Sequence, residues 1–112
     1  MKTYAVAFAP EAEDDLAELY DYIAAHGSPV TALQYTEAII TYCESMSSLP
    51  HRGNRRDDVR PGLRITNYKH RAVIAFEVDD PAGIVTVLGV YYGGRDYESV
   101  FGGGENSAPD RK

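Results

Sequence analysis

The spacing of the hydrophobic residues changes at a polar, basic segment, residues 51–61. Before this segment, apolar side chains between residues 10 and 49 recur every three or four positions, which is the period of an amphipathic helix. After it, the apolar runs are β-branched and aromatic and are separated by short turns, as is typical of strands. This order predicts an α+β fold, with helices in the first half and a sheet in the second.

Two helices are expected in the first half. Pro10 suits a first helical position, and the apolar stripe that follows it ends at His26–Gly27. Ser28 and Pro29 supply a cap and a start for a second helix, which runs until Pro50 stops it. Because the link between them is so short, the two helices should form an antiparallel hairpin.

Four strands are expected, one before the helices and three after the basic segment. The first covers Tyr4–Phe8, where large and small residues alternate. The others cover Leu63–Tyr68, Arg71–Val78 and Ile84–Tyr92, with turns that suit hairpins between them. The predicted order is therefore β-α-α-β-β-β, with an antiparallel sheet and the N-terminal helical hairpin packed on one of its faces.

The length of 112 residues fits one domain. A short turn through Phe101 is expected after the last strand, while residues 102–112 are too polar and too rich in glycine to pack. We therefore expect a folded domain over residues 1–101 and a disordered C-terminal tail. The sequence contains neither a signal-peptide pattern nor a run of about 18 apolar residues, so we expect a cytoplasmic protein with no membrane partner.

The sequence offers no support for a metal site or a cofactor. Its three histidines are far apart, no Cys-x-x-Cys pair exists, and the glycines at 102–104 lack the strand, lysine and helix of a phosphate-binding loop. The single cysteine, Cys43, falls on the apolar face of the second predicted helix and should be a small buried side chain. We expect no metal, no cofactor and no internal disulfide.

Charge is segregated along the chain. Residues 1–50 carry one base and eight acids, whereas residues 51–71 carry seven bases and two acids. The net charge of −6 therefore conceals an acidic helical half and one basic patch. Such a patch suits an anionic partner that docks on one face, but the acidic half would repel nucleic acid, so we do not expect the chain to bind nucleic acid directly on its own.

Arginines stand where the predicted strands begin and end. Arg64 and Arg71 open two of the strands, and Arg95 follows the last. From such positions guanidinium groups can converge over a small sheet, and their planar fork pairs with phosphate or carboxylate. The alternative is that each is a solvated strand-end residue. The predicted target-binding residues are Arg60, Arg64, Arg71, Tyr92 and Arg95.

Several motifs now combine with this order of elements. They are F-A-P-E-A-E-D-D-L-A-E-L-Y-D-Y-I in the first helix, S-L-P-H-R-G after the second, and R-P-G-L-R, Y-K-H-R-A-V-I-A-F-E-V and G-G-R-D-Y-E in the second half. Together, over residues 4–101, they resemble the ParE branch of the RelE/ParE superfamily of bacterial toxins, the killing half of type II toxin–antitoxin modules. The resemblance implies a cognate antitoxin, encoded by an adjacent gene, that forms a hetero-oligomer with this chain.

Two activities occur in this superfamily. RelE-like members are ribosome-dependent messenger RNA endonucleases, which need proton transfer and cationic stabilisation of a phosphorane. At the positions of their two lysines, two arginines and tyrosine, this chain has Arg64, Thr66, Arg71, Arg95 and Phe101. The uncharged threonine and the missing hydroxyl leave that set incomplete. If the chain were a nuclease, the three arginines would be its catalytic residues; otherwise no catalytic residue is predicted.

Other side chains near the predicted strands could replace the missing nuclease groups. The tyrosines are explained more simply as amphipathic packing residues and the histidine as an exposed turn residue, whereas the glutamate fits an edge charge as well as a catalytic carboxylate. These candidates are His70, Tyr68, Tyr91, Tyr92, Tyr97 and Glu77.

ParE-branch toxins are understood to act on DNA gyrase by protein contact and to stall the cleaved complex. By resemblance, the chain is a gyrase inhibitor that binds stoichiometrically, causes growth arrest and is not itself an enzyme. A third reading is a non-toxic member that retains only antitoxin binding and autoregulation.

The resemblance also implies where the antitoxin binds. In toxins of this type a partner segment wraps across the molecule, and we expect it in an apolar groove beside the helices. The predicted antitoxin-binding residues are Leu16, Leu19, Tyr20, Ile23 and Tyr42.

Overall fold

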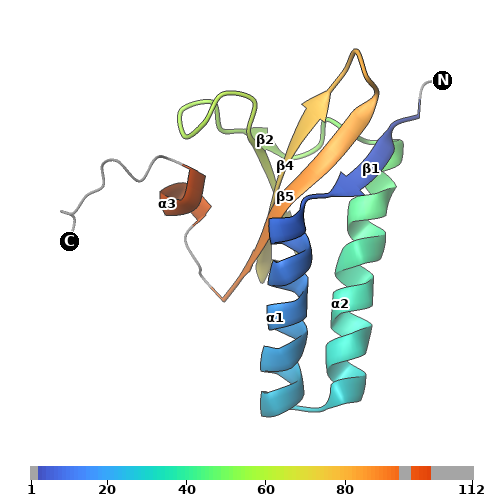
Figure 1. Ribbon diagram of the computed structural model, residues 1–112, viewed down its shortest axis with the longest axis vertical. Helices are drawn as coiled ribbons and strands as arrows, with labels where there is room; N and C mark the ends of the chain where they lie inside the picture. Colours follow the sequence, from blue (N-terminus) through green and yellow to red (C-terminus); the bar gives the residue numbers. More distant parts are fainter. Residues whose placement is uncertain (1–2, 94–96, 102–112) are drawn as a thin grey trace.

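The computed structural model of the protein describes residues 3–93 and 97–101. Its elements, in chain order, are β1 (Ala5–Phe8), α1 (Pro10–His26), α2 (Pro29–Glu44), a short 3-10 helix η1 (Ser45–Ser47), β2 (Asn54–Arg55), β3 (Arg64–Tyr68), β4 (Ala72–Asp79), β5 (Ile84–Tyr92) and α3 (Tyr97–Phe101). Helices α1 and α2 lie side by side against one face of the sheet, and the connected end of this hairpin projects beyond the sheet (Figure 1). The predicted α+β fold with a helical hairpin on one face is confirmed. The predicted disordered tail lies outside the described residues.

The helices begin where the sequence predicts. Pro10 occupies the first turn of α1, and at the other end the Gly27 amide donates to the Ile23 carbonyl oxygen at 2.8 Å. The Ser28 hydroxyl accepts a hydrogen bond from the Thr31 amide at 3.1 Å, which caps α2. Helix α2 is shorter than predicted, because its last turn tightens into η1.

The sheet has the strand order β1-β5-β4-β3-β2. Strands β3, β4 and β5 form the predicted antiparallel meander, but β1 pairs parallel to β5, with Ala5 opposite Ile84 and Phe8 opposite Val87. The sheet is therefore mixed and not antiparallel throughout. Alternation in the first strand indicated which side chains share a face, but it carries no information about the direction of the partner strand.

A two-residue strand, β2, lies within the basic segment that we predicted to be a loop. Asn54 and Arg55 pair with Ile65 and Arg64, and the chain enters this pairing through Gly53, whose φ is +76°. A Cβ atom at position 53 would lie 2.0 Å from the Ile65 carbonyl oxygen, so the close approach requires glycine. A strand of two residues is too short to give a periodic signal in the sequence.

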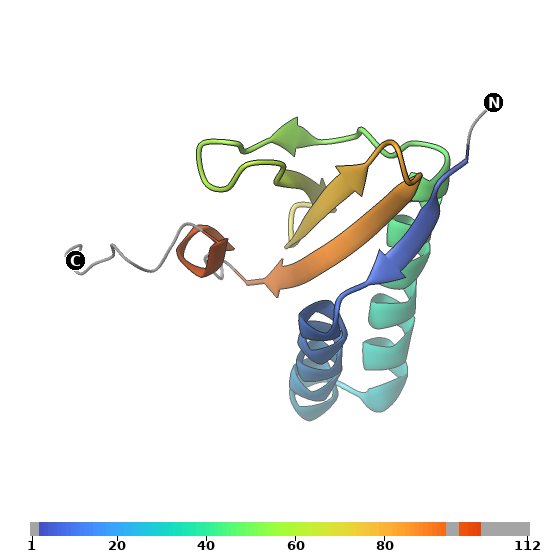
Figure 2. The ribbon, with the colours of Figure 1, turned by 45° about the horizontal axis from the view of Figure 1, so that its top comes forward.

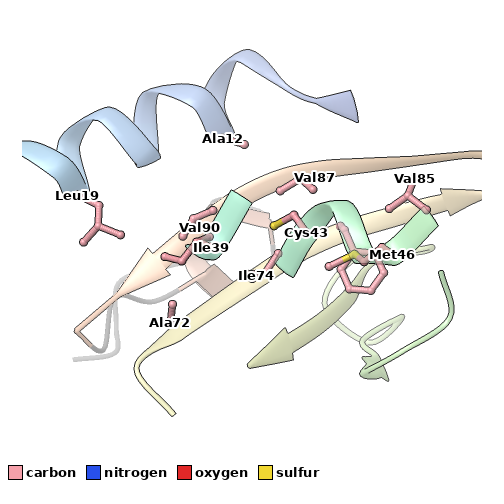
Figure 3. Packing of buried hydrophobic residues seen from close by; sticks show 11 residues of the cluster. Ala12, Leu19, Ile39, Cys43, Met46, Ala72, Ile74, Val85, Val87 and Val90 are labelled. Atoms are coloured by element: carbon pink, nitrogen blue, oxygen red, sulfur yellow. The ribbon is translucent and has the colours of Figure 1, made fainter. Parts of the chain in front are cut away.

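The main core lies between the helical hairpin and the sheet, as Figure 3 shows. It is built from Ala12, Leu19, Ile39, Cys43, Met46, Ala72, Ile74, Phe76, Val85, Val87 and Val90. Cys43 is fully buried, as predicted, and burial raises the pKa of its thiol to about 12. The thiol therefore stays protonated and unreactive in the folded protein.

A bulge in β5 sets which side chains face the helices near its end. Ala75 pairs with Gly89 but Phe76 pairs with Val87, so Leu88 has no partner in β4. The bulge shifts the alternation of inward and outward side chains along β5. As a result Val90 belongs to the main core, and Tyr92 packs against that core.

The opposite face of the sheet carries a smaller apolar cluster. Leu63, Ala75 and Tyr91 are buried there, and the side chains of Tyr97 and Phe101 from α3 pack on them. Figure 2 shows α3 beside the sheet and away from the helical hairpin. The predicted short turn through Phe101 is thus a short helix that covers this second cluster. No helix in the described part of the chain is long and apolar enough to span a membrane.

Candidate interaction surface

Arg64 is directed toward the protein's own backbone. Its guanidinium donates hydrogen bonds to the carbonyl oxygen of Arg52, at 3.3 Å through Nε, and to that of His51. These bonds tie the loop after η1 to the start of β3. A structural role therefore accounts for this half-buried arginine, which we had predicted to contact a target.

A second group of arginines holds α3 in place. Arg56 forms ion pairs with Asp58, at 2.8 Å, and with Glu98, at 2.9 Å, and also donates to the Tyr97 hydroxyl. The hydrogen bonds with Asp58 and Glu98 raise the pKa of the Arg56 guanidinium, and Arg56 in turn lowers the pKa of Asp58. The Arg60 guanidinium lies 5.7 Å from the centre of the Phe101 ring. Nothing in the sequence distinguished Arg56 from its basic neighbours.

Arg64 and Arg71 do not converge. Arg64 lies opposite Phe76, whereas Arg71 immediately precedes Ala72, which lies opposite Tyr68. The chain reverses between β3 and β4, so residues that open consecutive strands stand at opposite ends of the hairpin. Arg95, the third predicted member of this group, lies outside the described residues.

Asp79 and Asp80 lie at the far end of β4 from Arg71. Asp79 ends β4, while Arg71 precedes its first residue. Asp80 accepts a hydrogen bond from the Tyr4 hydroxyl at 2.6 Å and lies 2.9 Å from Nε2 of His51. The structure therefore excludes pairing of Arg71 with either carboxylate.

Three consecutive basic residues, Lys69, His70 and Arg71, form what we call the basic corner. With Tyr92 and Gly93 they line a shallow pocket of about 550 Å³. Lys69 and His70 have φ angles of 52° and 60°, a left-handed conformation that is unfavourable for residues with a Cβ atom. Among the described residues, none of the ion pairs involves a residue of the basic corner.

A row of tyrosine rings lies between the helices and the sheet, and one of them, Tyr92, lines the pocket beside the basic corner. Tyr35 of α2 stands edge-on to Tyr68, with ring centres 5.9 Å apart, and to Tyr92, with ring centres 5.7 Å apart. Tyr42 continues the row on one side, 5.2 Å from Tyr68, and Tyr22 on the other, 6.4 Å from Tyr92. Of these rings, the sequence analysis had named Tyr68 and Tyr92 as packing residues and Tyr92 also as a target-binding residue.

A second pocket, of about 380 Å³, lies between α1 and the end of β5. It is lined by Asp15, Glu18, Leu19, Tyr22, Val90, Tyr92 and Gly93. Strand β1 pairs with β5 only as far as Val87, and beyond it the Asp15 carboxylate accepts a hydrogen bond from the Val90 amide at 3.0 Å. Tyr92 borders both pockets, so this predicted target-binding residue lies at a surface with room for a partner.

The predicted antitoxin-binding residues mostly face inward. Leu19 is only 6% exposed, Leu16 and Ile23 pack against the main core, and the Tyr42 ring packs against Tyr68; Tyr20 is half-buried. The expected groove beside them is filled by the protein's own sheet. The apolar stripe that predicts an amphipathic helix is the same stripe that packs on the core, so it cannot by itself indicate a docking surface.

Other apolar side chains remain available at the connected end of the helical hairpin. Tyr22 of α1 is 54% exposed, and Val30 and Leu33 at the start of α2 are 64% and 49% exposed. This end of the hairpin extends past the sheet in Figure 1, so the core does not cover it. Sequence reasoning missed these residues because they fall outside the regular stripe.

Two of the positions that match the nuclease set, Thr66 and Phe101, pack within the protein. Thr66 is 8% exposed and its hydroxyl is hydrogen-bonded to the Tyr42 hydroxyl at 2.8 Å. Phe101 packs edge-on against Tyr91, with ring centres 6.1 Å apart. Of the substitute groups, Tyr97 is bonded to Arg56. Among the described residues, no cluster of three metal-ligating side chains occurs.

The fold matches solved toxin–antitoxin structures. The chromosomal ParDE system of P. aeruginosa matches with a TM-score of 0.70 and 19% identity, covering 80% of this chain and 96% of that one. The RelBE2 complex of Mycobacterium tuberculosis matches with a TM-score of 0.61 and 21% identity, covering 85% and 97%. A mutant E. coli toxin RelE in the free state matches with a TM-score of 0.62 and 16% identity, covering 89% and 94%. These likenesses show the fold.

The sequence itself decides the family. No curated protein matches it. Residues 6–97 match the family model described as the ParE toxin of the type II toxin–antitoxin system, parDE, which is most of the chain. The chain therefore belongs to the ParE toxin family of type II toxin–antitoxin systems.

Proposed function

We propose that this type II toxin acts on DNA gyrase by stoichiometric binding, stalling the cleaved gyrase–DNA complex, and that an antitoxin encoded by an adjacent gene neutralises it. The ParE family match over residues 6–97 supports the choice of gyrase over the ribosome. The observation that carries the proposal is the burial of Thr66 beneath Tyr42, because it removes a position that nuclease chemistry would use.

Ribosome-dependent cleavage needs a group that moves a proton and several cations around one phosphate. Here the side chains that pack on the sheet face opposite the helices include Val73, Ala75 and Leu88, which can do neither. Arg64 is bonded to backbone carbonyls and Arg71 stands at the other end of the hairpin. The arrangement supports a protein that binds its target without catalysing a reaction.

The surface we propose for gyrase is the basic corner together with Tyr92. It combines cations with an aromatic ring beside a hollow, and Arg and Tyr are enriched among the residues that dominate protein interfaces. The acidic α1 lies on the adjacent side, which favours contact with a protein surface over wrapping by DNA. Arg95 remains a predicted target-binding residue.

We propose that the antitoxin forms a hetero-oligomer with this chain and lays an amphipathic helix on the connected end of the helical hairpin. Tyr22, Val30 and Leu33 supply exposed apolar anchors there. Co-expression with the antitoxin should raise the soluble yield of this chain. Purification of the chain alone as a non-toxic, fully soluble monomer would count against a dedicated partner.

Induction of the protein without its antitoxin tests the proposed target in cells. We expect growth arrest, filamentation and a DNA-damage response, without codon-phased cuts in translated messenger RNA by primer extension. A chain that ends at Phe101 should act equally, because residues 102–112 lack the apolar side chains needed to pack. Codon-phased cuts within minutes would identify the ribosome, and not gyrase, as the target. Unimpaired growth would favour a non-toxic, autoregulatory member.

A further inference from the structure

The turn between β3 and β4 has a backbone that its own residues do not favour. The Arg71 amide donates to the Tyr68 carbonyl oxygen at 3.1 Å, and the two residues between them, Lys69 and His70, both have positive φ angles. A turn of this kind selects asparagine, aspartate or glycine at its two central positions, because other side chains are unfavourable there. The chain has a lysine and a histidine instead, so stability does not explain the choice of residues.

The side chains of this turn gather at one hollow. Lys69, His70 and Arg71 are all exposed, and all three line the shallow pocket that Tyr92 also lines. The Lys69 ammonium lies 5.6 Å from the centre of the Tyr68 ring, which is a contact with a ring face and not with an anion. Residues in unfavourable backbone conformations cluster at sites that bind a ligand. The backbone of the turn thus holds three basic side chains around one open pocket.

The basic corner differs from the other arginines of the segment 51–71. Those arginines have partners within the protein, which are aromatic rings for Arg52 and Arg60, carboxylates for Arg55 and Arg56, and backbone carbonyls for Arg64. In the described part of the chain, no ion pair or side-chain hydrogen bond involves a residue of the basic corner. The three side chains therefore have donors to offer to an anion from outside the chain.

A phosphate group matches three basic side chains better than a carboxylate does. Its oxygens point in several directions, so it can accept from the Arg71 fork and from Lys69 and His70 together. The two oxygens of a carboxylate lie in one plane and serve one fork well. Arginine and lysine are also common contacts of a nucleic-acid backbone. The arrangement therefore favours phosphate as the ligand.

The charge near the basic corner limits how much nucleic acid can lie there. Residues 1–50 carry eight acids and one base, and Asp15 and Glu18 of α1 line the neighbouring pocket, which shares Tyr92 with the basic corner. A long stretch of backbone would bring further phosphates against these carboxylates. The site therefore fits one phosphate that another protein holds in place better than it fits free nucleic acid.

We propose that Lys69, His70 and Arg71 bind one backbone phosphate of the DNA that gyrase holds. The source of the phosphate rests on the proposed function, whereas the phosphate site itself does not. The toxin then contacts gyrase where protein and DNA meet, with Tyr92 beside the phosphate. Asparagine and glycine would relieve the backbone of the turn but would supply no charge to this ligand.

Inorganic phosphate tests the site without gyrase. In the free protein, we expect the amide resonances of the basic corner to shift saturably as sodium phosphate replaces sodium chloride at constant pH and ionic strength. Lys69→Asn with His70→Gly, which suits the same turn, should weaken this binding about tenfold, and so should Arg71→Gln. Lys69→Arg, which keeps the charge, and Arg55→Gln, at an exposed arginine paired with Asp57, should retain it.

Two results of this titration would overturn the site. Absence of a saturable shift would overturn it whether or not gyrase is the target. Equal affinity for sodium acetate would overturn the choice of phosphate.

Thermal unfolding of the same double variant separates binding from folding. Lys69→Asn with His70→Gly should raise the thermal midpoint, because asparagine and glycine adopt the left-handed conformation at lower cost. A lowered midpoint with unchanged phosphate binding would mean that the lysine and the histidine serve the fold, and would overturn the proposal.

Gyrase with and without DNA tests the source of the phosphate. We expect the double variant to bind the gyrase–DNA complex about tenfold more weakly than the wild type does, with little change in its affinity for gyrase alone. Equal weakening in both cases would assign the basic corner to an anion of the protein and overturn DNA as the source. If the wild type bound phosphate but no gyrase, the proposed target would be wrong and the phosphate site would stand.

Discussion

The hydroxyl oxygens of Tyr42 and Thr66 lie 2.8 Å apart, so a side-chain hydrogen bond joins α2 to β3 across the helix–sheet interface. Thr66 stands where the resemblance to RelE-like nucleases would place a lysine, and it is 8% exposed. A charged side chain would have to be desolvated to occupy this position. In this chain the hydrogen bond thus occupies a position that the resemblance to RelE-like nucleases assigns to a charged side chain.

Removal of both hydroxyls of the Tyr42–Thr66 pair should destabilise the protein less than the sum of the two single removals. We expect Tyr42→Phe to lower the free energy of unfolding by about 1 kcal/mol, because it leaves the Thr66 hydroxyl without its partner. The double variant Tyr42→Phe with Thr66→Val should be closer to wild type than the sum of the single changes. Urea unfolding measures each value, with Tyr22→Phe as an exposed control. Simple additivity would contradict the bond.

Arg56 should control the docking of α3. Because Arg56 joins Asp58 to Tyr97 and Glu98, Arg56→Gln should increase amide hydrogen exchange in residues 97–101. Arg55→Gln is the matched control, since Arg55 pairs with Asp57 instead. Equal exchange in the two variants would show that apolar contacts alone hold the helix.

The ion pair between Arg56 and Asp58 should make the docking of α3 depend on pH. Arg56 holds the pKa of Asp58 below its ordinary value in the folded state, so the ionised carboxylate favours folding. This contribution is fully present above the unfolded pKa, about 4, and is lost as the pH falls through the lower folded pKa. Protection of α3 should therefore decrease in acid in the wild type, and decrease less in Arg56→Gln.

Arg64 should act through stability. Because its guanidinium bonds the carbonyl oxygens of His51 and Arg52, Arg64→Glu should lower the thermal midpoint along with toxicity. Arg71→Glu should abolish toxicity with little change in the midpoint. Circular dichroism melts beside growth assays separate the two. If Arg64→Glu lost toxicity while its thermal midpoint stayed unchanged, Arg64 would be a target-binding residue after all.

The Cys43 thiol should be alkylated only when the protein unfolds. Burial raises the pKa of its thiol to about 12, whereas an unfolded cysteine ionises near about 8.5. The unfolded state therefore releases the proton first, and stability should fall as the pH rises above the unfolded value. Alkylation at pH 9 should be slow in the native protein and fast in urea, as mass spectrometry can follow. Rapid native alkylation would contradict the burial.

The starts of both helices and the β3–β5 meander could be predicted, because prolines, Ser28 and changes in hydrophobic period act locally. The parallel pairing of β1 could not be predicted, since direction depends on where the whole chain returns. The separation of Arg64 from Arg71 could not be predicted for a related reason: position along the sequence shows that both open strands, but only the register shows that they stand at opposite ends of a hairpin. The packing of Leu16 and Leu19 on the core could not be told from docking, because core and docking surface share one apolar signature.

Purified gyrase tests the central claim most directly. The protein, released from its antitoxin, is incubated with supercoiled plasmid in the presence and absence of gyrase and ATP, and linear DNA is measured after protease treatment. We predict linear DNA only when gyrase is present, in proportion to the amount of toxin added and not with catalytic turnover. The gyrase assignment would be contradicted if the protein left supercoiling unchanged and caused no gyrase-dependent cleavage, although it still arrested growth in cells. The family assignment would remain in place.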